Sequence, residues 1–209
     1  RNHPFNPRAS AFICGQIKEG MGEHMRIPVI AGNWKCYTRL DSARALAAGL
    51  RERIDGIKGV EKVVCPPFVY LSVVGEALAG SSIRLGAQDV HWEDDVAATG
   101  EVGPKMVAEL AEYVIIGHSE RRHQFGETDE MVNRKVKAAL RLGSGQALAA
   151  GLKPIMCVGE KLQERQAGLT GEVLVRQTRS GLDGADLPEG FIIAYEPVWA
   201  IGTGKTATS

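Results

Sequence analysis

Six short apolar runs, each rich in β-branched residues, place the strongest constraint on what this chain can fold into. They lie at residues 27–31, 62–65, 82–85, 113–116, 154–158 and 191–195. Each of the first five runs is followed by a segment with the apolar spacing of a helix. This alternation predicts an α/β fold in which right-handed helical crossovers join a parallel sheet. Because the runs lack strict polar alternation, we expect both faces of the sheet to be covered.

The first two helical segments show their apolar faces most clearly. One stripe consists of Leu40, Ala43, Ala47, Leu50 and Ile54, and the other of Val69, Val73, Ala77 and Leu78. We expect Thr38 or Asp41 to cap the first helix, because either side chain can accept a hydrogen bond from a free N–H group of the first turn.

Two parallel architectures compete, an open doubly wound sheet and a closed eight-stranded β/α barrel. An open dinucleotide-binding sheet would need GxGxxG after its first strand, whereas residues 32–35 read Gly-Asn-Trp-Lys. Polar residues come directly after four strands, namely Asn33 and Lys35, Gln88, His118 and Glu120, and Glu196. In a barrel these residues would meet at the carboxyl-terminal rim of the strands, where such folds place their active sites. The sequence therefore favours the barrel.

Charge and cysteine content exclude several classes of function. The chain has 25 Lys and Arg residues and 25 Asp and Glu residues, so its net charge is zero. It therefore has no excess of positive charge that would indicate binding to nucleic acid or to a membrane surface. No apolar stretch approaches the roughly 18 residues needed to span a bilayer. The four cysteines form no CxxC pair, so neither a metal site nor a disulfide framework is supported. We interpret them as small buried hydrophobes in a reducing compartment.

Residues 1–25 differ from the rest of the chain. They mix Asn, Pro, Gly and charged residues without a regular apolar period and lack the pattern of a secretory signal. We expect an irregular extension or linker at 1–25, with a natural start at Met25 or Met21, followed by one domain at 26–209.

Three of the residues at the rim carry the candidate chemistry. Lys35 would be a fixed cation suited to an anionic substrate, unless it is a solvated loop lysine. His118 follows Gly117, and a helix that starts there would lower the pKa of the His118 ring. The neutral imidazole could then donate a hydrogen bond to a carbonyl oxygen. The alternative is a structural role, which is the usual one for a lone histidine. Glu196 lies before Pro197 in a partly desolvated mouth that raises its basicity, with a buried ion pair as the alternative.

Residues 198–207 have an apolar body and small residues at the far end, which is typical of a lid that moves about short hinges. Gly202 could offer a backbone N–H to a phosphate group. A nucleotide-binding P-loop is excluded, because Trp199 stands where the pattern that ends in Gly204-Lys205-Thr206 requires glycine.

Four motifs together resemble the triosephosphate isomerase family over residues 26–209. They are Asn-Trp-Lys at 33–35, Gly-His-Ser-Glu-Arg-Arg at 117–122, Cys-Val-Gly-Glu at 157–160 and Tyr-Glu-Pro-Val-Trp-Ala-Ile-Gly-Thr-Gly-Lys at 195–205. The resemblance implies a TIM barrel that interconverts dihydroxyacetone phosphate and D-glyceraldehyde 3-phosphate through an enediolate. It also implies a role in glycolysis and gluconeogenesis in the cytoplasm, with neither a metal nor an organic cofactor.

The resemblance also implies roles for individual residues. Glu196 would be the base, His118 the electrophile, and Lys35 and Asn33 the substrate-binding pair. Glu120 would be a supporting rim carboxylate that contacts Lys35. The lid glycine would be Gly202, whose N–H binds phosphate, and the loop at 88–101 would insert into a second subunit and form a homodimer.

Three features depart from the family pattern. Ala98 replaces a common aromatic residue, and a Gly-Ser insertion near 141–148 interrupts the expected fourth helix. By comparison with the eight β/α units of such a barrel, we expect about six units in these 209 residues, without the last two strands. We therefore expect open sheet edges, weak stability, aggregation or dependence on a missing segment. These departures leave open a fragment that is inactive alone, a non-catalytic phosphate-binding remnant of the same fold, and another phosphate-binding barrel enzyme.

Overall fold

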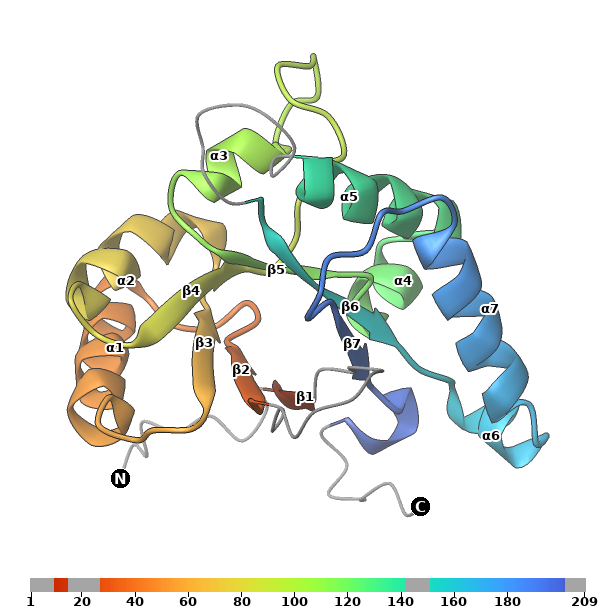
Figure 1. Cartoon of the computed structure of the whole chain (residues 1–209), viewed down its shortest axis with the longest axis horizontal. Coiled ribbons are helices and arrows are strands. Elements are labelled where there is room, and N and C mark those ends of the chain that lie inside the picture. Colours follow the sequence, from red (N-terminus) through yellow and green to blue (C-terminus); the bar gives the residue numbers. More distant parts are fainter. Residues whose placement is uncertain (1–9, 15–26, 142–150, 202–209) are drawn as a thin grey trace.

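The computed structural model describes residues 10–14, 27–141 and 151–201. Its seven strands form one sheet in the order β1 to β7. Six of them are parallel, namely β2 (Val29–Asn33), β3 (Glu61–Cys65), β4 (Ile83–Ala87), β5 (Tyr113–Ile116), β6 (Lys153–Val158) and β7 (Ile192–Tyr195). Figure 1 shows that this sheet curls into part of a barrel with the helices around its outside. The predicted α/β fold and all six predicted strands are confirmed.

The strands are linked by helices and 3-10 turns. Their bounds are α1 (Leu40–Ile54), η1 (Phe68–Tyr70), α2 (Leu71–Leu78), α3 (Pro104–Ala108), α4 (Ser119–Gln124), α5 (Asp129–Arg141), α6 (Leu162–Gln166), α7 (Thr170–Leu182) and η2 (Val198–Ala200). Within the described ranges, no helix combines the length and the apolar character needed to cross a membrane.

Two predicted details of the helices are wrong. Helix α1 is capped at Arg39 and not at Thr38 or Asp41, because the hydroxyl of Ser42 reaches back and accepts the Arg39 N–H at 2.9 Å. Val69 lies in η1 with 79% of its surface exposed, since helix α2 begins only at Leu71. The apolar face of α2 is therefore built on Leu71, Val74 and Leu78.

Both faces of the sheet are covered, as predicted. Inward-facing residues form a compact core inside the curl, made of Val29, Ala31, Val63, Cys65, Tyr113, Ile115, Ile155, Cys157, Ile192 and Ala194. Their neighbours on the strands belong to a second core beneath the helices, which includes Val64, Val114, Ile116 and Met156. The alternation follows from the two-residue period of a strand.

Five residues near the start of the chain form strand β1 (Ser10–Cys14). The prediction of irregular structure at residues 1–25 is therefore wrong for these five. It pairs with β2 in antiparallel register, with Ser10 opposite Asn33 and Cys14 opposite Val29, and it also contacts β7. An edge strand presents unpaired N–H and C=O groups, which an extended segment of good β propensity can satisfy. The outer edge of β2 is therefore not open, contrary to expectation, while the division of the chain at residue 25 stays a prediction.

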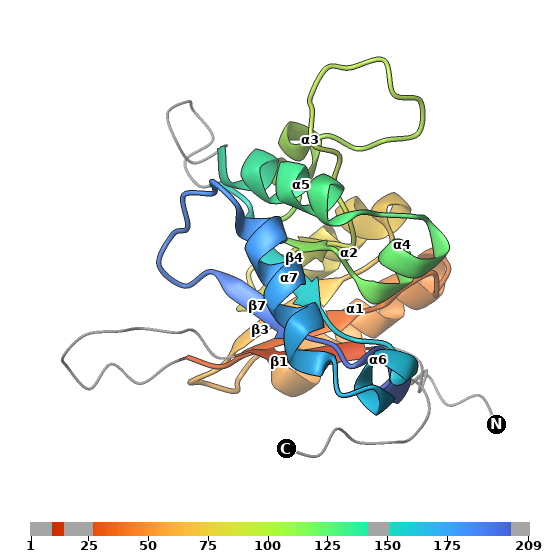
Figure 2. The same ribbon diagram turned by 90° about the vertical axis from the view of Figure 1, so that its right-hand side faces the viewer.

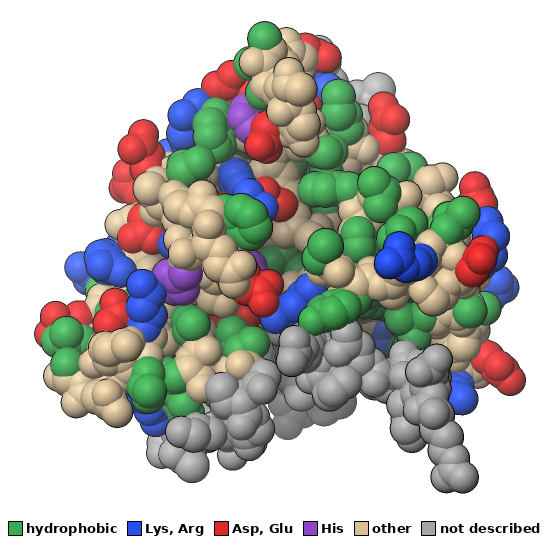
Figure 3. All heavy atoms as spheres, turned by 180° about the vertical axis from the view of Figure 1, so that it is seen from behind, with side chains coloured by type: hydrophobic (Ala, Val, Ile, Leu, Met, Phe, Trp, Pro, Cys, Tyr) green, Lys and Arg blue, Asp and Glu red, His purple; other side chains and the backbone are tan. Residues whose placement is uncertain are grey.

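Charged side chains of both signs lie on the surface of the protein. Figure 3 shows Lys and Arg interspersed with Asp and Glu on the face opposite to that of Figure 1. Helix α5 is described as far as Arg141, and the remainder of the predicted Gly-Ser insertion near 141–148 lies outside the described residues.

Candidate active site

The side chains predicted to carry the chemistry lie at the carboxyl ends of three strands. Asn33 is the last residue of β2, His118 follows β5 and Glu196 follows β7. Lys35 lies in the turn after β2, where its backbone N–H donates to Asn33 Oδ1 at 2.9 Å. Parallel strands end at the same rim, so residues far apart in the sequence become neighbours there. The predicted lid residue Gly202 lies outside the described residues.

His118 and Glu196 form the closest pair at this rim. The Nε2 atom of His118 lies 2.7 Å from Oε1 of Glu196, and each side chain is only 4% exposed. The other carboxylate oxygen of Glu196, Oε2, accepts the backbone N–H of Ser119 at 3.1 Å. The carboxylate of Glu196 is therefore held between an imidazole ring and the first N–H group of α4.

The hydrogen bonds around His118 define which ring nitrogen carries the proton. His118 precedes α4, and its Nδ1 accepts the backbone N–H of Glu120 at 3.2 Å. An accepting Nδ1 carries no proton, so this arrangement assigns a neutral imidazole with its proton on Nε2. The predicted helix start directly after His118 is confirmed, and the ring nitrogen that carries the proton, Nε2, is the one 2.7 Å from Glu196 Oε1.

Lys35 is fixed in position and is not a solvated loop lysine. Its side chain is 10% exposed, and Nζ lies 2.7 Å from Oε1 of Glu120. The backbone of Lys35 has φ of 54°, a left-handed conformation that non-glycine residues rarely adopt. The amide of Gln88 stabilises this turn by donating to the carbonyl oxygens of Lys35 at 2.9 Å and Cys65 at 2.8 Å. The ammonium group is thereby held at the rim beside Glu120, whose other carboxylate oxygen lies 3.6 Å from His118 Nδ1.

Glu160 is a buried carboxylate whose importance the sequence reasoning missed. It is fully buried and accepts hydrogen bonds from the Tyr195 hydroxyl at 3.1 Å and from Trp199 Nε1 at 2.9 Å. Burial raises its pKa, but hydrogen bonds from Trp199, its own backbone and Tyr195 outweigh burial and hold the pKa below its ordinary value. Glu160 thus holds Tyr195 before Glu196 and Trp199 after it. Its only sequence signal was membership in the motif at 157–160.

Replacing Glu160 with Gln is expected to reduce the stability of the protein in a pH-dependent way. Since the folded state lowers the pKa of Glu160, its ionised form favours folding above pH 4.5, the ordinary value, and this contribution is lost as the pH falls below it. The difference in free energy of unfolding between wild type and Glu160→Gln should therefore shrink on acidification. Urea unfolding over a pH series measures it, with the exposed Glu172→Gln as control. A difference that grows on acidification contradicts this assignment.

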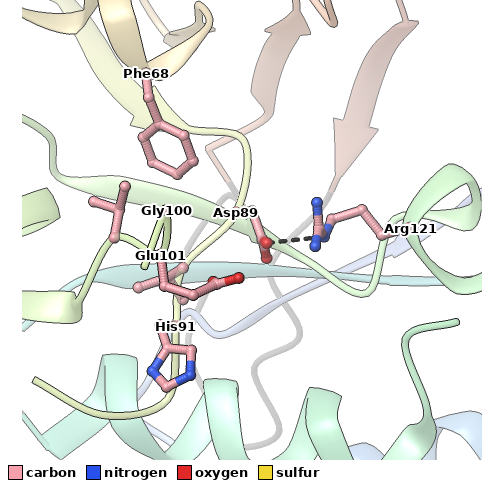
Figure 4. A pocket seen from close by; sticks show the side chains of 8 residues that line it. Phe68, Asp89, His91, Gly100, Glu101 and Arg121 are labelled. Atoms are coloured by element: carbon pink, nitrogen blue, oxygen red, sulfur yellow. Dashed lines mark ion pairs between the residues drawn. The ribbon is translucent and has the colours of Figure 1, made fainter. Parts of the chain in front are cut away.

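A charge cluster of Asp89, Arg121, Glu127 and Lys135 lies next to the rim. Lys135 Nζ is 2.7 Å from Asp89 and 3.3 Å from Glu127, and Arg121 Nε is 2.8 Å from each carboxylate. Figure 4 shows Arg121 and Asp89 together at one side of a small pocket. Burial and, to a lesser extent, Glu127 raise the pKa of Asp89, whereas Lys135 and Arg121 oppose this shift. The sequence analysis did not identify this cluster.

The cysteines were predicted to be small buried hydrophobes. This prediction is confirmed for two of the three cysteines whose side chains are described. Cys65 and Cys157 are buried and reduced, whereas Cys36 is exposed. Burial raises the pKa of the Cys65 thiol to about 12, which keeps it protonated and unreactive.

A family model and individual relatives, compared with this chain, all indicate one family. A family model described as triosephosphate isomerase matches residues 28–209. The chain is 51% identical to the triosephosphate isomerase of Dehalococcoides mccartyi over 185 residues, which are 88% of this chain and 70% of the relative. It is also 51% identical to that of Carboxydothermus hydrogenoformans and 52% identical to that of Moorella thermoacetica, covering 88% of this chain in both cases and 71% and 72% of the relatives.

Proposed function

The chain belongs to the triosephosphate isomerase family, and we propose that Glu196 and His118 carry out its interconversion of dihydroxyacetone phosphate and D-glyceraldehyde 3-phosphate. The observation that carries this assignment is the approach of His118 Nε2 to within 2.7 Å of Glu196 Oε1 in a buried setting. A carboxylate and a neutral imidazole donor at this spacing can act on a carbon and on its oxygen at the same time.

The proposed reaction moves one proton between two neighbouring carbon atoms and one proton between the oxygen atoms that they carry. The carboxylate of Glu196 removes a proton from the carbon beside the substrate carbonyl, while the Nε2–H of His118 hydrogen-bonds to the carbonyl oxygen. His118 then gives its Nε2 proton to the enediolate oxygen and takes a proton from the hydroxyl group on the neighbouring carbon atom. Glu196 returns its proton to the carbon that carried the carbonyl, which completes the isomerisation. The backbone N–H of Ser119 holds Oε2 of Glu196, and we assign the proton transfer to Oε1, the oxygen beside His118.

Electrostatics at the rim support binding of an anion. Lys35 provides a positive charge that balances the negative charge developing on the enediolate, and Asn33 orients the turn that carries it. Glu120 holds the ammonium group of Lys35 in place at 2.7 Å. We assign the phosphate contact to the backbone N–H of Gly202 in the proposed lid. Proton transfers of this kind need no metal and no organic cofactor.

We place this reaction in glycolysis and gluconeogenesis in the cytoplasm. The free thiols of Cys36, Cys65 and Cys157 support a reducing compartment.

A coupled spectrophotometric assay of the 209-residue chain with D-glyceraldehyde 3-phosphate tests the proposed function. The expected result is formation of dihydroxyacetone phosphate at a rate proportional to protein concentration. A folded chain that binds triose phosphate without turnover would instead support the non-catalytic alternative.

The proposed assembly is a homodimer formed through the loop at 88–101. Figures 1 and 2 show the chain between β4 and α3 projecting away from the sheet. Val96 in this loop is 45% exposed, and Asp94 braces the loop base by accepting the Lys105 N–H at 2.8 Å. An exposed apolar residue on a braced projection is suited to insertion into a partner.

Replacing Val96 with Asp is expected to shift the dimer towards monomer, because a carboxylate would be buried unpaired in the interface. Analytical ultracentrifugation of both proteins at several concentrations measures the shift. The matched control is Val175→Asp on α7, where the valine is 50% exposed. A monomeric wild type, or an equal shift in both variants, would exclude this interface.

A further inference from the structure

Gln177 on α7 forms a paired hydrogen bond with one peptide segment at the rim. Its side chain is buried, its Oε1 accepts the Gly159 N–H at 2.8 Å, and its Nε2 donates to the Gly159 carbonyl oxygen at 3.2 Å. We propose that Gln177 is a positioning residue that fixes Glu196 through Gly159. This inference rests on the proposed role of Glu196 as the base.

The paired hydrogen bonds are needed because of where Gly159 lies. It follows β6 directly, beyond the last residue of the strand, and it is buried. Buried backbone groups without partners are costly, so the N–H and C=O of Gly159 require partners. The amide of Gln177 provides a donor and an acceptor in the same plane, and so fixes the position and the orientation of this residue.

Gly159 is in close contact with the backbone of Glu196. A Cβ atom at position 159 would collide with the Glu196 carbonyl oxygen, so the two segments can approach this closely only because residue 159 is glycine. The residues on either side of Gly159 are also joined to this segment. The Glu196 N–H donates to the Val158 carbonyl at 2.8 Å, and the Val198 N–H donates to the Glu160 carbonyl at 3.1 Å.

These contacts connect α7 to the proposed base by a short path. Gln177 fixes Gly159, Gly159 contacts the backbone of Glu196, and that backbone carries the carboxylate 2.7 Å from His118 Nε2. If the amide of Gln177 is lost, the peptide at Gly159 must turn to find other partners, and the backbone of Glu196 moves with it. A displacement of about 1 Å at a reacting group can lower the rate by about 10²-fold.

Gln177→Met is a suitable test, because methionine has a similar shape and removes both hydrogen bonds. We expect kcat to fall by about 10- to 100-fold with KM changed by less than about 2-fold, since the base acts on the bound substrate. The matched control is Val173→Ala, a buried position one turn away on α7 that contributes to packing but not to the paired hydrogen bond. For this control we expect kcat within about 2-fold of the wild type when the folded fractions are matched.

A second measurement does not depend on turnover. The Ser119 N–H donates to Oε2 of Glu196, so exchange of this amide proton reports the position of the carboxylate. By NMR we expect faster exchange at Ser119 in Gln177→Met than in Val173→Ala. Unchanged Ser119 exchange in Gln177→Met, or equal losses of kcat in both variants, overturns the inference. A wild type without turnover would contradict the proposed function instead, and Ser119 exchange would still test the role of Gln177.

Discussion

Replacing Glu196 with Gln is expected to lower kcat for triose phosphate isomerisation by about 10²- to 10⁴-fold, the usual contribution of a positioned acid or base. The amide keeps the shape of the carboxylate and can still accept the Ser119 N–H, but it cannot take a proton from carbon. Because the site stays packed, KM should change far less than kcat. Steady-state kinetics in the coupled assay measure both constants, and circular dichroism verifies that the variant is folded.

The matched control for this prediction is Glu172→Gln, which makes the same chemical change at an exposed position on α7. Its kcat should equal that of the wild type. If Glu196→Gln retains wild-type turnover, Glu196 is not the base and the proton transfers must be assigned to another group.

Replacing Lys135 with Met is expected to lower the free energy of unfolding by about 3–5 kcal/mol, the range for removing one partner of a buried ion pair. The side chain of Lys135 is 3% exposed and lies between Asp89 and Glu127, which are 9% and 2% exposed. Without the ammonium group, Arg121 would be the one cation among the described residues that is paired with these two buried carboxylates. Denaturant unfolding at neutral pH measures the loss.

The matched control is Lys105→Met, because Lys105 pairs with Asp95 at the surface, where both side chains are mostly exposed. A surface pair of this kind contributes at most about 1 kcal/mol. Since the pKa of Asp89 is raised, mainly by burial, Asp89 takes up a proton more readily than an ordinary aspartate. The effect of Lys135→Met should therefore shrink as the pH falls. Equal losses for both lysine variants would show that the charge cluster contributes little.

The parallel strands could be predicted from the sequence because each is a short β-branched run buried on both faces. Their common direction then placed Asn33, His118 and Glu196 at one rim, which is a consequence of topology and not of any single motif. The turn after β2 brings Lys35 to the same rim. The chemistry-bearing residues were thus predictable because they lie directly at strand ends.

Other features depend on contacts that no local pattern reveals. The pairing of β1 with β2 depends on an unpaired edge that only the folded sheet presents. The cap of α1 was misassigned because Ser42, inside the helix, reaches back to Arg39. Gln177 and Lys135 lie on helices that read as ordinary amphipathic segments, and their partners Gly159 and Asp89 are 18 and 46 residues away.

Isomerisation of dihydroxyacetone phosphate in D₂O tests the central claim most directly. A proton held by a carboxylate exchanges with solvent, so an enediolate mechanism incorporates deuterium at C2 of the D-glyceraldehyde 3-phosphate that forms. We predict that the wild-type chain yields product labelled at C2, detected by NMR after rapid trapping of the product. Product formed at the enzymatic rate without deuterium at C2 would contradict proton transfer through Glu196 and an enediolate.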